Sequence, residues 1–109
     1  MKNISDMSIL ITGGGSGIGE GTASYFVKHG AKVTICGRNK DKLENVSKKL
    51  GNSCHAVKCD ITKNDERIDL IEEAINHGQK LNALINNAGN MLRGPITDLN
   101  EDKLLDLFH

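Results

Sequence analysis

A glycine-rich segment near the amino terminus holds the first residues that could do chemistry. Residues 12–19 read TGGGSGIG and directly follow a short apolar run. A helix amino terminus exposes unpaired N–H groups and about half a positive charge, so a phosphate group can bind there. Gly13 can take the tight turn, Gly17 can let the backbone approach a phosphate, and Gly19 can let the helix pack closely. The segment therefore predicts a phosphate-binding turn between a strand and a helix.

The spacing of these glycines narrows the class of nucleotide. A P-loop ends in Gly-Lys followed by Ser or Thr, but Gly19 is followed by Glu20 and Gly21, which leaves no lysine for a triphosphate. The pattern GxGxxG fits in no register, whereas TGxxxGxG fits with every fixed residue in place. A glycine turn can also serve a purely steric purpose, so this alternative stays open if the turn is taken alone.

Strand and helix patterns alternate along the chain. Strands are predicted over four apolar runs, at residues 8–12, 32–36, 54–58 and 81–85. Helices are predicted between them, over residues 17–29, 41–50 and 64–77. Parallel strands joined through helices need right-handed crossovers, so we predict an α/β fold with a parallel sheet covered on both faces.

Two helices carry more detailed expectations. In the first, Ile18, Thr22, Tyr25 and Phe26 recur at helical spacing and are expected to form its apolar side. A further helix is expected to begin near Leu99, with its residues continuing to 108. The predicted order is therefore βαβαβαβ plus the start of another helix.

Length and charge limit the classes of function. The chain has 109 residues, which suits a single domain over residues 1–109. Its 14 Lys and Arg residues balance 14 Asp and Glu residues, so the chain has no net positive charge that would attract nucleic acid. No apolar run approaches the roughly 18 residues of a membrane helix, and no basic leader is visible. We expect a cytoplasmic protein without a nucleic acid or membrane partner.

The three cysteines are expected to be buried, reduced thiols. Cys36, Cys54 and Cys59 form no CxxC pair, and their odd number leaves a thiol over. The alternative is a metal site formed by Cys54, His55 and Cys59. Because adjacent residues on a strand point to opposite faces, Cys54 and His55 are poorly placed to share one ion.

Three features together resemble the short-chain dehydrogenases/reductases. They are the TGGGSGIG turn, Asp60 after the third strand, and the segment NNAG at residues 86–89 after the fourth. The resemblance implies a Rossmann-type doubly wound parallel sheet, here incomplete, and hydride transfer between a nicotinamide cofactor and a carbonyl or alcohol substrate. It also implies that the cofactor is contacted by residues of these three features and their neighbours, namely Thr12, Gly13, Ser16, Gly17, Ile18, Gly19, Asp60, Ile61, Asn87, Ala88 and Gly89. A capping role for Asp60 and a plain turn at NNAG are the alternatives.

The end of the second strand indicates which cofactor is bound. A carboxylate at this place would accept hydrogen bonds from the ribose hydroxyls of NAD(H) and repel a 2′-phosphate. Here Gly37 is followed by Arg38, whose guanidinium can pair with a phosphate. We therefore expect NADP(H) rather than NAD(H), with a solvated surface arginine as the alternative.

The residues that would complete catalysis are not found in the chain. The family uses a Tyr and a Lys four residues later, with a Ser and an Asn, but the only tyrosine is Tyr25, in the first helix. No catalytic residue is therefore predicted. We expect an amino-terminal fragment, inactive alone, of a parent enzyme that forms homo-oligomers. A non-catalytic dinucleotide sensor or truncated relic is the alternative, and a nucleotide-sugar epimerase fits less well because its TGxxGxxG pattern is broken at Ser16.

Overall fold

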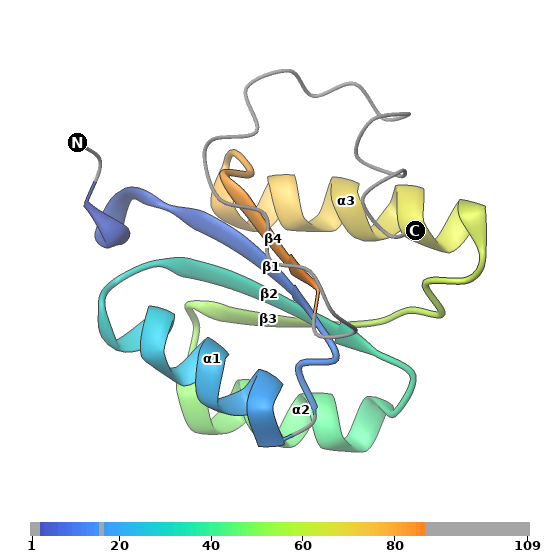
Figure 1. Cartoon of the computed structure of the whole chain (residues 1–109), viewed down its shortest axis with the longest axis horizontal. Coiled ribbons are helices and arrows are strands. Elements are labelled where there is room, and N and C mark those ends of the chain that lie inside the picture. Colours follow the sequence, from blue (N-terminus) through green and yellow to red (C-terminus); the bar gives the residue numbers. More distant parts are fainter. Residues whose placement is uncertain (1–2, 16, 87–109) are drawn as a thin grey trace.

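The computed structural model describes residues 3–15 and 17–86 (Figure 1). A short 3-10 helix, η1 (Ile4–Asp6), precedes the first strand. The strands are β1 (Ser8–Thr12), β2 (Lys32–Gly37), β3 (Cys54–Lys58) and β4 (Ala83–Asn86). The helices are α1 (Gly17–Lys28), α2 (Lys40–Leu50) and α3 (Asn64–Gly78). The predicted elements are confirmed to within two residues at each end, while the helix expected after Leu99 lies outside the described residues.

The four strands form one parallel sheet in the order β3-β2-β1-β4. Helices α1 and α2 lie on one face of this sheet and α3 lies on the other (Figure 1). The chain moves outward from β1 to β3 and then crosses to the far side of β1 to form β4. The predicted α/β fold is confirmed, and its strand order reverses direction between β1 and β4.

The alternation of side chains along β1 divides the core into two layers. Ile9 and Ile11 pack with the residues under α1 and α2, whereas Leu10 packs with those under α3. All five residues of β1 are buried, as expected for a strand covered on both faces.

The buried side of α1 differs from the prediction. Ile18 and Tyr25 are 78% and 52% exposed, so these two of the apolar positions at helical spacing do not pack in the core. Gly19 and Ala23 are buried instead. These small residues let the helix approach the sheet closely, and this close approach outweighs the pattern set by the larger apolar residues.

The three thiols are buried and free, which confirms the prediction for them. Burial raises the pKa of Cys36 to about 12 and the pKa values of Cys54 and Cys59 to about 11. Cys54 packs in the layer under α1 and α2, whereas Cys59 packs in the layer under α3. A metal site shared by these two thiols and His55 is therefore contradicted, because the sheet separates the sulfurs. Among residues 3–15 and 17–86, no three metal-binding side chains converge.

Candidate nucleotide-binding site

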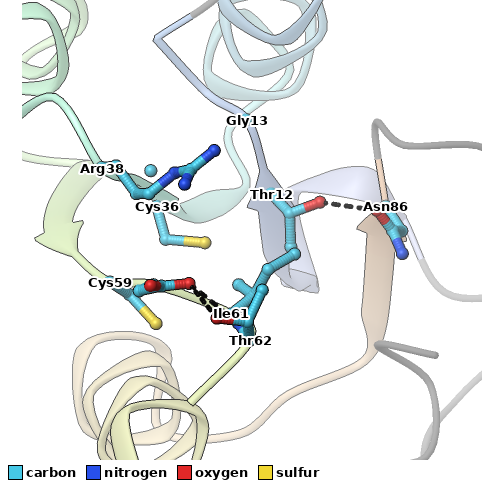
Figure 2. A pocket seen from close by; sticks show the side chains of 10 residues that line it. Thr12, Gly13, Cys36, Arg38, Cys59, Ile61, Thr62 and Asn86 are labelled. Carbon is cyan, nitrogen blue, oxygen red and sulfur yellow. Dashed lines mark hydrogen bonds between the residues drawn. The ribbon is translucent and has the colours of Figure 1, made fainter.

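The carboxyl ends of the four parallel strands border a cavity of about 360 Å³ (Figure 2). This volume falls within the range of small-molecule sites. Its walls are formed by the ends of the strands and the loops that follow them, through Thr12, Gly13, Cys36, Gly37, Arg38, Cys59, Asp60, Ile61, Thr62 and Asn86. Open α/β sheets bind ligands at this edge, where the strand order reverses. The position of the cavity therefore follows from the topology.

A hydrogen bond closes the sheet at the point of reversal. The Oγ1 atom of Thr12 donates to Oδ1 of Asn86 across 3.0 Å (Figure 2). Thr12 is only 3% exposed, and its hydroxyl also approaches the carbonyl of Ile85 at 3.5 Å. The first fixed residue of the TGxxxGxG pattern thus joins β1 to β4 and fixes the floor on which a ligand would lie.

The glycine turn is held against β2. Gly13 has a φ of +68°, in the left-handed region that favours glycine. The amide of Gly14 donates to the carbonyl of Cys36 at 3.1 Å. A Cβ added at Gly14 would overlap the side chain of Ile35, so this position also requires glycine. The motif treats Gly14 as a free position, and sequence reasoning missed its role because only the packing against β2 reveals it.

The first turn of α1 presents open space beside the cavity wall. A Cβ added at Gly17 would meet no described atom within 4 Å, whereas Gly19 is buried against the sheet. The burial of Gly19 agrees with the close packing predicted for it, whereas the approach of a phosphate at Gly17 stays a prediction. Ile18, between them, is exposed on the surface of the helix. A helix amino terminus of this kind attracts an anion, and no described atom fills the space that a side chain at Gly17 would occupy.

The loop after β3 places a carboxylate at the far wall of the cavity. Asp60 Oδ1 accepts hydrogen bonds from the Thr62 hydroxyl at 2.7 Å and the Thr62 amide at 3.0 Å. These bonds hold the pKa of Asp60 below its ordinary value of 3.8, and the positive charge of Arg38 lowers the pKa further. Asp60 is therefore ionised at neutral pH and oriented by its own loop. These bonds show the turn-forming role of Asp60, while its contact with a ligand stays a prediction.

A second cavity of about 270 Å³ lies between the glycine turn and the start of α2. It is lined by Gly13, Gly15, Gly37, Arg38, Asn39, Lys42 and Leu43, so two side chains carry positive charge and none carries negative charge. The side chain of Asn39 caps α2 by accepting from the Lys42 amide at 3.1 Å. This cavity suits an anionic group attached to the ligand of the larger cavity. Lys42 was not predicted, because it lies four residues beyond Arg38 in the sequence and only the first turn of α2 places it beside the same cavity.

Those predicted site residues that the structure describes lie at one edge of the sheet. Five of them line the larger cavity, namely Thr12, Gly13, Arg38, Asp60 and Ile61. Three more occupy the first turn of α1, namely Gly17, Ile18 and Gly19. The remaining four, Ser16, Asn87, Ala88 and Gly89, lie outside the described residues. Thr62 lines the cavity as well and was missed, although the Asp-x-Thr spacing is a common turn signal that could have indicated it.

Comparison with known proteins agrees with this geometry. The family model of the short chain dehydrogenases matches residues 7–109. The chain belongs to this family. This short-chain dehydrogenase is similar to an uncharacterized oxidoreductase of Staphylococcus aureus strain MRSA252, with 43% identity over 94% of this chain and 45% of that protein. The chain thus spans less than half the length of this curated relative.

Solved structures support the same family. A 3-ketoacyl-(acyl-carrier-protein) reductase from Brucella melitensis, complexed with NADH, is similar with a TM-score of 0.70 and 41% identity, over 72% of this chain and 32% of that one. A short chain dehydrogenase from Bacillus anthracis is similar with a TM-score of 0.77 and 28% identity, over 97% of this chain and 49% of that one. Within the described part of this short-chain dehydrogenase, no helix is long and apolar enough to cross a membrane.

Proposed function

We propose that this chain binds the nicotinamide dinucleotide of an oxidoreductase that transfers hydride to or from a carbonyl or alcohol substrate. The observation that carries the proposal is the cavity at the β1–β4 reversal, which has the glycine turn on one side and Asp60 on another. A diphosphate at the open first turn of α1 would place the adenosine over the ends of β2 and β3. The carboxylate of Asp60 would then accept a hydrogen bond from the adenine amine.

The second cavity favours NADP(H) over NAD(H). A 2′-phosphate on the adenosine ribose would enter the space between Arg38 and Lys42, where it would find two cations. The place where NAD-specific proteins carry a carboxylate is taken by Gly37. A Cβ at Gly37 would make only ordinary contacts with Leu43, the nearest at 3.6 Å, so packing does not require glycine there. Glycine at this position therefore fits a need to avoid negative charge better than a need for space.

The cofactor preference is tested by the dissociation constants of NADP⁺ and NAD⁺ for the 109-residue chain. We expect NADP⁺ to bind at least about tenfold more tightly, the worth of one hydrogen bond to a charged group. Arg38→Gln and Lys42→Gln should each reduce this preference. The matched control is Lys40→Gln, because Lys40 lies on the same helical turn but pairs with Glu44 at 3.8 Å. A preference of the unmodified chain for NAD⁺ would refute the NADP(H) assignment.

The remaining chemistry is proposed for a longer parent protein. The 109 residues contain no Tyr followed four residues later by Lys, so we propose that the proton donor for hydride transfer comes from a part of the protein beyond this chain. We further propose a small-molecule carbonyl or alcohol substrate, homo-oligomeric assembly of the parent and a cytoplasmic location. Purified residues 1–109 should show no NADPH-dependent reduction of carbonyl compounds, and measurable turnover would contradict this.

A dinucleotide sensor is the second candidate, since the described residues line a cavity but include none of the catalytic groups that the family uses. The two candidates differ in the parent protein. A Ser followed by the Tyr-x-x-x-Lys pattern in its further sequence favours the enzyme, whereas a parent that binds NADP⁺ and lacks that pattern favours the sensor.

A further inference from the structure

A buried guanidinium lies beneath the loop that carries Asp60. Arg67, in the first half of α3, is only 6% exposed. Its Nη1 atom donates to the carbonyl of Ile61 at 2.7 Å, and its Nη2 atom donates to Oδ1 of Asn64 at 3.0 Å. One planar group thus joins the loop after β3 to the first residue of α3. Its two donors point in the fixed directions of a fork, which a flexible ammonium group could not reproduce.

The loop has its own internal bonds, and Arg67 supplies the anchor beneath them. The Thr62 amide donates to Oδ1 of Asp60 at 3.0 Å, and the Lys63 amide donates to the Asp60 carbonyl at 3.0 Å. The Asp60 amide donates to Oε1 of Glu66 at 3.2 Å. The bonds from the Thr62 and Lys63 amides fix the shape of the loop. The bonds to Glu66 and from Arg67 tie the loop to α3, and the Arg67 bond is the one that holds Ile61. Both Asp60 and Ile61 line the larger cavity.

The position of Arg67 is poor for stability. Burying a guanidinium removes its hydration, and this cost is usually met by a carboxylate partner. Among the described residues, no carboxylate lies within ion-pair distance of Arg67, and its Nε atom is buried without a hydrogen-bond partner. An apolar side chain of similar length would fill the same space at a lower desolvation cost. A buried charge that adds little to stability, yet holds a loop of the binding cavity, indicates a role in function.

We propose that Arg67 is a positioning residue that holds the Asp60–Ile61 loop in the geometry needed to recognise the adenine of the dinucleotide. This inference rests on the proposed function. Arg67 does not line the cavity, so it acts on the ligand through its hydrogen bond to the carbonyl of Ile61. Loss of the guanidinium leaves the fold intact and lets the loop open, so the carboxylate of Asp60 is no longer held opposite the base.

The first test needs no ligand. In Arg67→Met, we expect amide hydrogen exchange at Thr62 and Lys63 to accelerate by about tenfold, the effect of losing one charge-assisted hydrogen bond. Exchange at the sheet residues Ile11 and Ile35 should not change, and the melting temperature should stay the same or rise. Asn64→Ala, which removes the Nη2 acceptor at an exposed position, should change the same two amides in the same direction and serves if Arg67→Met does not fold. Lys48→Met, at an exposed position of α2, is the matched control and should leave both amides unchanged.

The second test uses NADP⁺ and its hypoxanthine analogue, which lacks the adenine amine. The unmodified chain should bind NADP⁺ more tightly than the analogue, and Arg67→Met should lose most of this difference. Accelerated exchange throughout the sheet, or unchanged exchange at Thr62 and Lys63, would overturn the positioning role. An unmodified chain that binds neither nucleotide would refute the proposed function and the adenine role together, while the exchange data would still decide whether Arg67 holds the loop.

Discussion

Thr12 and Asn86, which lie 74 positions apart in the sequence, meet through a 3.0 Å hydrogen bond between their side chains. This bond joins the carboxyl ends of β1 and β4, the two strands between which the sheet order reverses. It lies at the base of the larger cavity, where both residues contribute to the wall (Figure 2). The residue that opens the glycine motif therefore also builds the floor of the site.

Removing the Thr12 hydroxyl should destabilise the chain. We expect Thr12→Val to lower the free energy of unfolding by about 1 kcal/mol, because Oδ1 of Asn86 loses a buried donor. Thr34→Val is the matched control on β2, since the Thr34 hydroxyl is buried and has no hydrogen-bond partner among the described residues. That variant should be neutral or stabilising in urea unfolding. Equal losses in the two variants would show that the Thr12 bond adds nothing.

Gly14 should tolerate no side chain. Gly14→Ala places a methyl group against Ile35 of β2, and we expect a loss of about 1–3 kcal/mol from overpacking. Gly21→Ala offers the contrast, because a Cβ at Gly21 meets nothing within 4 Å among the described atoms and lies in the exposed middle of α1. This variant should gain about 0.5–1 kcal/mol from helix propensity. Thermal unfolding of both variants distinguishes the packing account from a general intolerance of the glycine segment.

Gly17→Ala should separate stability from binding. The added methyl group meets open space in the described structure, so the melting temperature should not fall. A diphosphate at the first turn of α1 would contact that methyl group, and the affinity for NADP⁺ should drop by at least about tenfold. Calorimetric titration beside thermal unfolding measures both effects. Undiminished affinity would mean that the ligand does not approach the helix at Gly17.

The bonds from Thr62 predict a pH dependence. Because the pKa of Asp60 is lowered in the folded chain, its contribution to stability is present above pH 3.8 and is lost as the pH falls through the folded pKa. Thr62→Val removes the hydroxyl hydrogen bond, which is the largest cause of the lowered pKa, so the pKa of Asp60 should rise toward 3.8. The stability difference between the two proteins should then vanish in strong acid.

Carboxyl carbon shifts followed by NMR titration measure the pKa of Asp60 directly. Thr22→Val, which removes a hydroxyl bonded to the Ile18 carbonyl on α1, should leave the titration of Asp60 unchanged. An Asp60 titration in Thr62→Val that matches the unmodified chain would show that the hydroxyl does not stabilise the carboxylate.

Local patterns predicted most of the fold, because each strand and helix carries its own periodicity and its own stop signal. They predicted the edge of the sheet at which the glycine turn, Arg38 and Asp60 meet, since the carboxyl ends of parallel strands share one edge. Local patterns failed where contacts between elements determine which residues are buried. The side of α1 that packs on the sheet is set by the small residues Gly19 and Ala23, and the need for glycine at position 14 comes from Ile35 on another strand.

The same limit applies to the charged residues. Arg67 lies on the buried side of α3 together with Leu70 and Ile71, although the charge of its side chain favours exposure to solvent. Only the tertiary structure shows its guanidinium buried beneath Ile61. Lys42 joins Arg38 because α2 begins between them and turns its first residues back toward the glycine turn. The roles of Arg67 and Lys42 therefore depend on packing between elements and on the geometry of one helical turn, which the sequence pattern does not predict.

We propose that a nicotinamide dinucleotide binds across the carboxyl ends of β1, β2 and β3. NMR titration of the isotope-labelled 109-residue chain with NADP⁺ tests it most directly, because each amide reports its own surroundings. We expect saturable shifts at Gly13, Gly17, Arg38, Asp60 and Ile61. The amides of His55, near the amino end of β3, and His77, near the carboxyl end of α3, should not shift. Shifts centred on His55 and His77, or no saturable shifts at millimolar NADP⁺, would contradict it.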